Sequence, residues 1–264
     1  MNAEQLRKKI MEKTKKQVKE KLSGKEAHII RAMNALEDLE LMFNMLFEDV
    51  REWYSLHFPE IFQIAKDPEK CLSLIANLGA RENFKKNEIE KLYGNVESAS
   101  MLEEKAKCSV GGEASIENTK QISAVAKTAL ELRKLRNELA THIEKEMLEQ
   151  APNLTKVAGP MLGAKLLCHA KSLKKLAFVP SSTIQLIGAE KALFKHLRKG
   201  TKPPKHGIIF QHPLMRRVKK ENRGKMARAI ANKISIAAKE DYFSKRDISK
   251  ELITELEEKA KNLS

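Results

Sequence analysis

The chain has 264 residues, with 50 Lys and Arg against 35 Asp and Glu, so its formal net charge at pH 7 is +15. Glycine and proline are sparse and aromatic residues make up 5% of the chain, which favours an all-α protein long enough for two modules. No run of eighteen apolar residues occurs, and no apolar signal segment follows the Lys-rich start, so we expect neither a membrane span nor secretion. Cys71, Cys108 and Cys168 are odd in number and far apart, which fits free or buried thiols in a reducing compartment.

Two helices are predicted at the start of the chain. The first covers residues 2–21 and ends at Ser23-Gly24, and the second runs from about residue 25 to 56, where Pro59 ends or bends it. Met42, Met45 and Phe47 widen the apolar face of the second helix, so more than one partner helix is expected to pack there. Apolar positions alternate three and four residues apart along that helix, as in a coiled coil: Ile29, Ala32, Leu36, Leu39, Phe43, Leu46, Val50 and Trp53.

Short helices are predicted between this helix and a second long one at residues 115–150. Asp67-Pro68 is a favourable helix start, a capping acid followed by proline, and that helix should end near Gly79. Residues 86–107 favour one or two further helices. Two long striped helices joined by a helical tip should form an antiparallel coiled coil, and the stripes alone leave an intramolecular hairpin and self-association equally open. The second stripe is Ile122, Val125, Ala129, Leu132, Leu135, Leu139, Ile143 and Met147.

The remainder of the chain is predicted to form a compact set of helices that starts at an Ala151-Pro152 hinge. Gly159-Pro160 opens a helix, residues 180–183 favour a turn and a helix cap, and a helix should run from about 222 to 243. Arg223 and Lys225 lie in the first turn of the helix predicted at 222–243, where cations oppose the helix dipole. This unfavourable placement makes sense if the two side chains face phosphate.

A helix predicted at about residues 189–199 is basic on one face. Its cations fall at i, i+4 and i+7, which places them together: Lys191, Lys195 and Arg198. Another face carries Leu193 and Leu197, which we expect to dock the helix onto a core. Gly200 should end the helix after a basic last turn.

A basic loop follows at residues 201–206. Pro203-Pro204 fixes the backbone, so its cations lose less conformational entropy when they bind a partner. Residues 208–210, Ile-Ile-Phe, are expected to return the chain to the core. The loop and the segment after it present Lys202, Lys205, His206, Arg216 and Arg217.

The whole positive charge lies in one block. Residues 156–233 contain nineteen Lys and Arg and two acids, Glu190 and Glu221, whereas the rest of the chain has 31 basic and 33 acidic residues. A solvated basic face would explain any single short Lys run. A block this one-sided repels itself unless it meets a polyanion, and nucleic acid is the expected polyanion.

Catalytic patterns are missing from the sequence. It contains no GxGxxG, no P-loop, no HExxH and no CxxC pair. Cys168 and His169 are adjacent, so on a helix they point about 100° apart and cannot easily act as nucleophile and base. His206 and His212 flank an apolar segment, but no Cys or acidic cluster completes a metal site. We therefore predict no catalytic residue, no metal ligand and no cofactor.

Three stretches of the basic block resemble a known signature: GAEKALF from Gly188, PPKHG from Pro203 and IFQHP from Ile209. The signature is that of the Nop domain, found in the core proteins of box C/D small ribonucleoproteins and in a related spliceosomal protein. The form it resembles most is the archaeal homologue of the paired nucleolar core proteins. Four further stretches match in order: REWYSLHFPE from Arg51, APNL from Ala151, GAKL from Gly163 and VPSSTIQ from Val179.

The resemblance implies an all-α fold in which a long antiparallel coiled-coil domain precedes a compact helical Nop domain. Residues 1–23 would be a remnant of the larger N-terminal domain with which many family members hold fibrillarin. Residues 24–150 would be the dimerising coiled coil, and residues 151–264 the RNA- and ribonucleoprotein-binding Nop domain.

The function that the resemblance implies is a non-catalytic scaffold. It would bind the complex of a kink-turn box C/D guide RNA and its ribosomal-type kink-turn protein. It would also position the methyltransferase fibrillarin for RNA-guided 2′-O-methylation of rRNA or tRNA, as a homodimer in the archaeal cytoplasm or the eukaryotic nucleolus. The residues expected against RNA are Gly188, Ala189, Glu190, Lys191, Lys195, Arg198, Lys199, Lys202, Lys205, His206, Gln211, Arg216, Arg217, Arg223 and Arg228.

Three alternatives remain at this point. The first is a spliceosomal-type Nop protein that binds a small nuclear RNA. The second is a coiled-coil interaction module whose basic block binds acidic protein partners. The third, an enzyme, would be established by methyl transfer from S-adenosylmethionine by this chain alone, which we do not expect.

Overall fold

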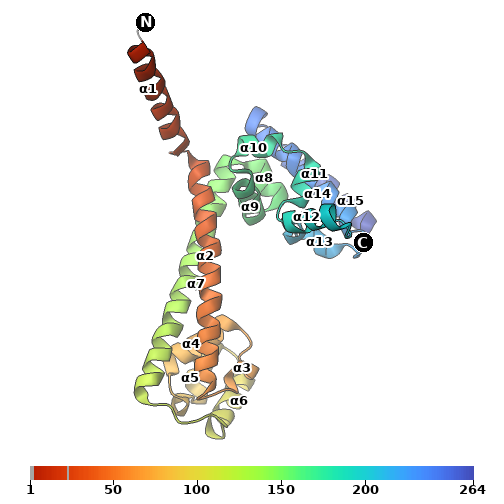
Figure 1. Ribbon diagram of the computed structural model, residues 1–264. Helices are drawn as coiled ribbons and strands as arrows, with labels where there is room; N and C mark the ends of the chain where they lie inside the picture. Colours follow the sequence, from red (N-terminus) through yellow and green to blue (C-terminus); the bar gives the residue numbers. More distant parts are fainter. Residues whose placement is uncertain (1–2, 23) are drawn as a thin grey trace. The chain divides into compact units, whose positions relative to one another are not determined.

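The computed structural model describes residues 3–22 and 24–264, and every regular element in these ranges is a helix (Figure 1). The predicted all-α fold is confirmed. Contacts divide the chain into two compact units, Leu36–Glu138, and Met1–Ala35 together with Leu139–Ser264. The predicted break at Ser23 lies outside the described residues, and the domain boundaries predicted at residues 23 and 150 stay a prediction. None of the helices in the described ranges is long and apolar enough to cross a membrane.

The two long helices lie close to the predicted bounds, as α2 (Lys25–Ser55) and α7 (Ile116–Gln150). They run antiparallel, because Lys25 at the start of α2 forms an ion pair with Glu149 near the end of α7. Deeper along the pair, Glu40 accepts hydrogen bonds from Arg133 and Arg136, with N–O distances of 2.9 Å to one carboxylate oxygen.

Short helices complete the unit Leu36–Glu138. Asp67 caps α4 as predicted, since its carboxylate accepts the backbone N–H groups of Glu69 at 2.9 Å and Lys70 at 3.1 Å. Gly79 ends the same helix. The helices are α3 (Ile61–Ile64), α4 (Pro68–Leu78), the 3-10 turn η1 (Arg81–Asn83), α5 (Lys86–Tyr93) and α6 (Val96–Lys107).

Two predicted seam positions are wrong. Trp53 is exposed, and Tyr54 is buried in its place with its hydroxyl donating to the carbonyl of Gly79 at 2.6 Å. Position 54 lies about one helical turn after the buried Val50 and therefore shares its face, whereas position 53 is turned away from that face. In α7, Leu135 is exposed, because it lies about 200° around the helix from Arg133, which meets Glu40 of α2.

A buried histidine fastens the Gly111-Gly112 turn. The Nδ1 of His57 lies 3.0 Å from the Gly112 carbonyl, and its Nε2 accepts the backbone N–H of Arg81 at 3.0 Å. A Cβ at Gly111 would lie 2.0 Å from the carbonyl oxygen of His57. Only glycine therefore permits this close approach.

The C-terminal helices surround α14 (Arg223–Lys239), which packs against α8, α10, α11 and α15. The predicted inward positions of α14 are confirmed as buried: Met226, Ile230, Ile234 and Ala237. The remaining elements of this unit are α1 (Ala3–Leu22), α8 (Pro152–Ala158), α9 (Pro160–Ala170), α10 (Leu173–Phe178), α11 (Ser181–Leu186), α12 (Glu190–Lys199), the 3-10 turn η2 (Ile208–Gln211), α13 (Leu214–Arg217), the π-helix η3 (Glu240–Ser244) and α15 (Ser249–Leu263).

The predicted proline hinge is a capped helix, α8. Asp241 accepts the backbone N–H groups of Asn153 at 3.0 Å and Leu154 at 2.8 Å, which satisfies donors that the first turn of a helix leaves unpaired. The Asn153 side chain in turn donates to Asp241 at 2.7 Å. Residues 88 positions apart thus fix the start of α8.

Of the turn and cap predicted at residues 180–183, Pro180 takes the cap position, but the turn is wrong, since Ser181 begins α11. The three polar residues Ser181-Ser182-Thr183 have low helix propensity. Packing of α11 against α14, with Ile184 buried between them, overrides that local preference.

Candidate nucleic-acid interface

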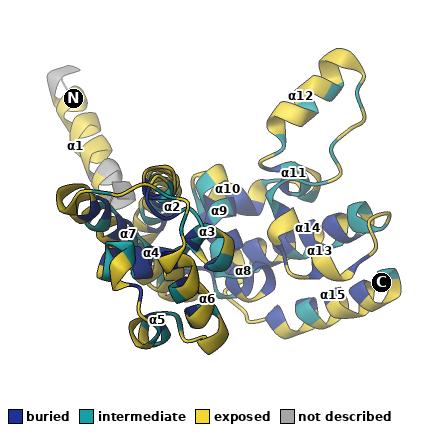
Figure 2. Ribbon diagram, turned by 90° about the horizontal axis from the view of Figure 1, so that it is seen from below, coloured by how far each residue is buried: buried dark blue, intermediate teal, exposed yellow. Residues whose placement is uncertain are grey.

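The basic helix α12 stands apart from the other helices of its unit and is exposed along its length (Figure 2). No residue of α12 is buried, and Phe194 and Leu197 are 61% and 69% exposed. The prediction that Leu193 and Leu197 dock this helix onto a core is therefore wrong. Of these two leucines, Leu193 is half-buried and Leu197 is exposed, because the helix is held at its two ends rather than along a face.

Gly188 holds the first end of α12. Its φ is +81°, and a Cβ at this position would lie 2.4 Å from the Cγ2 of Ile208. Its backbone N–H donates to the carboxylate of Glu190 at 2.8 Å, and this hydrogen bond holds the pKa of Glu190 below its usual range. Glu190 thus stabilises the turn before α12 as a carboxylate.

The second end is held by the loop after the helix. Gly200 adopts a left-handed conformation and donates to the His196 carbonyl at 2.8 Å, and the His196 ring bonds to the carbonyl of Thr201. Farther on, Gln185 donates to the carbonyl of Lys205 at 2.7 Å. Gly207 passes so close to α11 that a Cβ there would lie 1.9 Å from the carbonyl oxygen of Ile187.

Four predicted cations gather on α12 around an exposed ring. They line a shallow hollow of about 520 Å³, with the Phe194 side chain among them. The single acid of this helix, Glu190, is engaged at the helix start. The hollow therefore offers positive charge and an aromatic surface together, from Lys191, Lys195, Arg198 and Lys199.

A second group forms where the basic loop meets α14. The rings of His206 and Phe210 stack with centroids 4.7 Å apart, and the Arg223 guanidinium lies 5.4 Å from the Phe210 ring centre. Burial, together with the charges of Arg223 and Lys205, holds the pKa of His206 below its usual range, so the ring is neutral at pH 7. Phe210 is exposed, so the expectation that all of residues 208–210 return to the core holds for Ile209 but not for Phe210.

The other predicted residues lie at the surface without a shared contact. Gln211 is exposed at the end of η2, and Arg216 and Arg217 are exposed at the end of α13. Lys202 in the loop and Arg228 on α14 are likewise exposed. The fold thus builds two groups from the predicted residues, one on α12 and one around Phe210.

Phe194 and Phe210 belong to these groups and were missed as site residues. Their apolar side chains predict burial, and no periodicity in the chain contradicts that. The signal that could have found them is their setting, since Phe194 has cations within four positions on both sides and Phe210 lies between Lys205 and Arg216.

His212 is a structural residue. Its Nε2 lies 2.9 Å from the carbonyl oxygen of Val157, and its Nδ1 accepts the backbone N–H of Leu214 at 3.2 Å. Both bonds require the neutral ring with its proton on Nε2. Burial lowers the pKa of His212, which keeps that form. Across the described residues, no three His, Cys, Asp or Glu side chains come together as metal ligands would.

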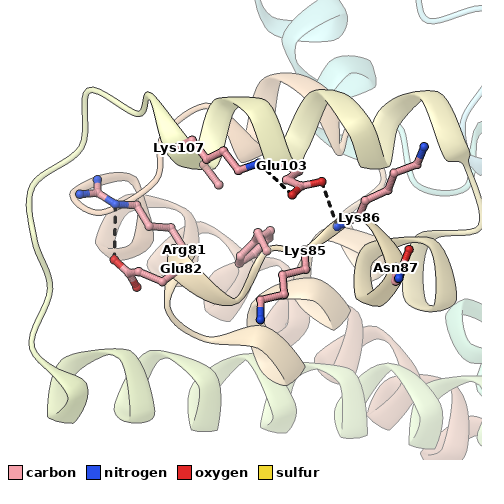
Figure 3. Close-up of a pocket in the computed structure, with 9 residues that line it drawn as sticks. Arg81, Glu82, Lys85, Lys86, Asn87, Glu103 and Lys107 are labelled. Atoms are coloured by element: carbon pink, nitrogen blue, oxygen red, sulfur yellow. Dashed lines mark hydrogen bonds and ion pairs between the residues drawn. The ribbon is translucent and has the colours of Figure 1, made fainter.

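A separate hollow of about 600 Å³ lies in the unit Leu36–Glu138 (Figure 3). Its central carboxylate, Glu103, accepts the backbone N–H of Lys86 at 3.3 Å and the Lys107 ammonium at 2.9 Å, which holds the pKa of Glu103 below its usual range. Arg81 and Glu82 lie 3.7 Å apart. Each acid of this hollow is thus paired with a cation, whereas no acid lines the hollow on α12.

The family model described as "Nop: snoRNA binding domain, fibrillarin" matches residues 35–262 of this chain. The chain belongs to the Nop family. An uncharacterised NOP5 family protein of Methanocaldococcus jannaschii is 43% identical over 266 residues, which is 99% of this chain and 64% of that protein. Nucleolar protein 58 of Aspergillus oryzae is 36% identical over 83% of this chain and 38% of its own length.

Nucleolar protein 56 of Caenorhabditis elegans, another Nop relative, is 35% identical over 84% of the chain and 47% of its own length. The chain thus spans 64% of the archaeal protein and less than half of the two nucleolar proteins. A solved chain from the crystal structure of a fibrillarin/Nop5p complex is 28% identical. It matches 99% of this chain and 78% of that one, with a TM-score of 0.55.

Proposed function

We propose that this Nop-family chain is a non-catalytic scaffold of a box C/D small ribonucleoprotein. It binds the complex of a kink-turn guide RNA and its kink-turn protein, and it positions fibrillarin for RNA-guided 2′-O-methylation of rRNA or tRNA. The observation that carries the proposal is α12, an exposed helix that presents four cations around an exposed Phe194.

The chemistry of α12 fits a composite surface better than bare RNA. Its lysines and arginines neutralise phosphate, which supplies most of the affinity for RNA but little sequence preference. Phosphate binding does not explain why the apolar side chains of Phe194 and Leu197 are exposed. Large apolar side chains gain free energy only when a partner buries them, at roughly 1.5–3 kcal/mol each. A protein or an unstacked base beside the phosphates would do so.

The second group has a complementary role in this proposal. His206 is neutral and stacked, so it can donate one hydrogen bond or stack on a base without adding charge. Arg223 lies against the other ring of the stack and is held in place for a phosphate. Arg216, Arg217, Arg228, Lys202 and Lys205 add phosphate contacts, and Gln211 can read a base edge.

Self-association is part of the proposed assembly. Leu41 and Met45 of α2 lie one turn apart and are 62% and 67% exposed, and Met42 beside them is exposed as well. Met42 and Met45 belong to the face expected to meet more than one partner helix, and a second copy would cover them together with Leu41. The resulting dimer would act in the cytoplasm of an archaeal cell or in the nucleolus of a eukaryotic cell.

The test is a gel-shift titration with a kink-turn guide RNA, with and without its kink-turn protein, across a salt series. We expect this chain to join only the preformed complex. Its affinity should fall steeply as salt rises, because bound phosphates release counterions. Binding to neither state would overturn the proposal, and the Nop fold would then serve another partner.

Two triple variants locate the contact. Lys202→Ala, Lys205→Ala and Arg216→Ala together should weaken joining about 10- to 100-fold and reduce the salt slope by about two to three. The matched control removes three exposed lysines of α7 outside the basic block, Lys120→Ala, Lys127→Ala and Lys134→Ala. Equal losses in both variants would show that net charge, not this surface, decides binding.

The competing assignments give different results in the same assay. A spliceosomal-type protein would join a complex built on a spliceosomal small nuclear RNA more tightly than one built on box C/D RNA. A module for acidic proteins would keep its partners after nuclease treatment of a cell extract, whereas the proposed scaffold would lose them.

A further inference from the structure

Three aromatic rings form an exposed cluster at the far end of α14 from Arg223. Phe178 ends α10, and Tyr242 and Phe243 belong to the π-helix η3. The Phe178 ring centre lies 5.6 Å from that of Phe243 and 6.5 Å from that of Tyr242, and the last two are 4.8 Å apart. Phe178 and Phe243 are 64% and 61% exposed. We call these three residues the aromatic cluster.

The aromatic cluster is held by buried hydrogen bonds beneath it. Asp241 is buried and turns inward, where it accepts the backbone N–H groups of Asn153 and Leu154 at the start of α8. The two residues after it carry the rings, so fixing Asp241 fixes their backbone. The backbone after the rings turns through a left-handed residue, Lys245, with φ of 55°. The rings are therefore presented on a defined backbone rather than on a loose loop.

Cations lie next to the rings, and the nearby acids are engaged elsewhere. Lys174 lies one helical turn before Phe178, and Lys239 lies one turn before Phe243, so each falls on the face of its ring, and both are exposed. Glu240 is within 3.5 Å of the Arg246 guanidinium. Asp241 is buried at the start of α8. The surface therefore combines stacking area with positive charge.

We propose that the aromatic cluster binds a single-stranded RNA segment by stacking its bases on Phe178 and Phe243 while Lys174 and Lys239 contact its phosphates. Stacking on exposed rings beside cations is how single strands bind without sequence preference. The charge complementarity favours RNA over an apolar protein helix, because such a helix would need no flanking cations.

This contact is separate from the interface proposed above. The 17 residues of α14 span about 25 Å, and Arg223 and the aromatic cluster lie at opposite ends of them. The inference rests on the proposed function only in taking RNA as the polyanion of this chain. RNA that leaves a kink-turn bound near α12 could reach the cluster as a single strand of several nucleotides.

The experiment uses the full chain and an oligouridine of about 12 nucleotides, within the usual site size for a single strand. Fluorescence anisotropy gives its affinity for the wild type and for Phe178→Ala with Phe243→Ala, Phe178→Leu with Phe243→Leu, and Lys174→Ala with Lys239→Ala. Circular dichroism checks that each variant is folded, which we expect because the substituted side chains are exposed. Ile236→Ala, an exposed apolar position on α14, is the matched control.

Stacking predicts that both the Ala and the Leu ring variants bind oligouridine at least about 10-fold more weakly, because leucine keeps the apolar area but has no π face. The lysine variant should bind more weakly and with a smaller salt slope, and Ile236→Ala should bind as the wild type does. Leucine variants that bind as the wild type does would overturn the proposal and indicate a site for a protein helix. Wild-type binding that none of these substitutions changes would overturn it as well.

A compact kink-turn hairpin without a single strand, bound to its kink-turn protein, separates this inference from the proposed function. Ring variants that join this complex normally but lose oligouridine binding support the cluster. A wild type that fails to join the complex while oligouridine binding still depends on Phe178 would contradict the proposed function alone.

Discussion

Two acidic residues of this protein stabilise the backbone through hydrogen bonds that their sequence surroundings do not predict. Glu190 stands in a block of cations, yet it accepts the N–H of Gly188 and shapes the turn before α12. Asp241 follows the charged residues Lys239 and Glu240, yet it is buried and caps α8 from 88 residues away. Replacing either would remove a hydrogen-bond acceptor for backbone donors, which is a structural effect separate from RNA binding.

The pH dependence of stability should depend on His212. Burial lowers the pKa of this ring, and its Nδ1 must stay unprotonated to accept the N–H of Leu214. A histidine whose pKa is lower in the folded protein than in the unfolded protein, where it is near 6.5, contributes its full stabilisation above pH 6.5. The stability is then lost as pH falls toward the folded pKa, with a slope of at most about 1.4 kcal/mol per pH unit for one proton.

Urea unfolding followed by circular dichroism at pH 7.5 and pH 5.5 measures this effect. His212→Asn should be less stable than the wild type at the higher pH, and the gap should narrow at the lower pH. The control is His142→Asn, at an exposed position of α7, which should keep the wild-type dependence on pH. A His212→Asn variant whose pH dependence equals that of the wild type would contradict the argument.

At the scale of elements, the long helices and α12 are stabilised in different ways. The helices α2 and α7 support each other along a shared seam, part of which is polar where Arg133 and Arg136 meet Glu40. Helix α12 has no such partner among the described residues and depends on the glycines at its ends. Its position is therefore set by backbone conformation rather than by side-chain packing.

A matched pair of glycine substitutions tests how α12 is held. Gly188 and Gly200 both have positive φ, at 81° and 63°, so alanine is strained at either position by about 1–2 kcal/mol. At Gly188 the new Cβ would also meet Ile208 at 2.4 Å, whereas at Gly200 nothing lies within 4 Å. Gly188→Ala should therefore lower the free energy of unfolding more than Gly200→Ala does, and it should weaken joining to the kink-turn complex more.

Urea unfolding and the gel shift described above provide the two measurements. Equal effects of the two substitutions on both would show that the contact between Gly188 and Ile208 does not position α12. A loss of stability in Gly188→Ala without any loss of binding would show that α12 is positioned by its partner and not by this turn.

At the scale of the whole molecule, the excess positive charge and the exposed apolar side chains of α2 lie in different parts of the chain. The basic block gathers on the C-terminal helices, and the chain outside it is close to neutral, with 31 basic and 33 acidic residues. Exposed apolar residues of α2 lie in that near-neutral part. This separation fits a scaffold that binds RNA with one region and a second copy of itself with another.

Self-association should depend on Leu41 and Met45. Replacing both by serine removes most of an exposed apolar patch one turn long, so the dimer should dissociate about 10-fold or more readily, while each monomer keeps its helices. Sedimentation equilibrium gives the dissociation constant. Val110→Ser, at an exposed loop position, is the control and should leave it unchanged. A wild type that stays monomeric at high concentration would refute the proposed dimer.

The sequence by itself determined the helical class, the two long helices to within about a residue at most ends, the inward face of α14 and the place of the positive charge. These follow from local rules, since periodicity, capping residues and composition act over a few residues. The sequence also located α12, which Gly200 ends, and the loop after it with Pro203-Pro204. What it could not give was their packing.

Only the tertiary structure decided which apolar residues are buried and what holds α12. Leu197 and Phe194 have the pattern of core residues, yet they are exposed because no element of the described chain lies over α12. Likewise, Tyr54 replaced Trp53 in the core, and Asp241 capped α8 from 88 residues away. Burial depends on which distant segments meet, and residues that are far apart in the chain leave no periodic signal of such a meeting.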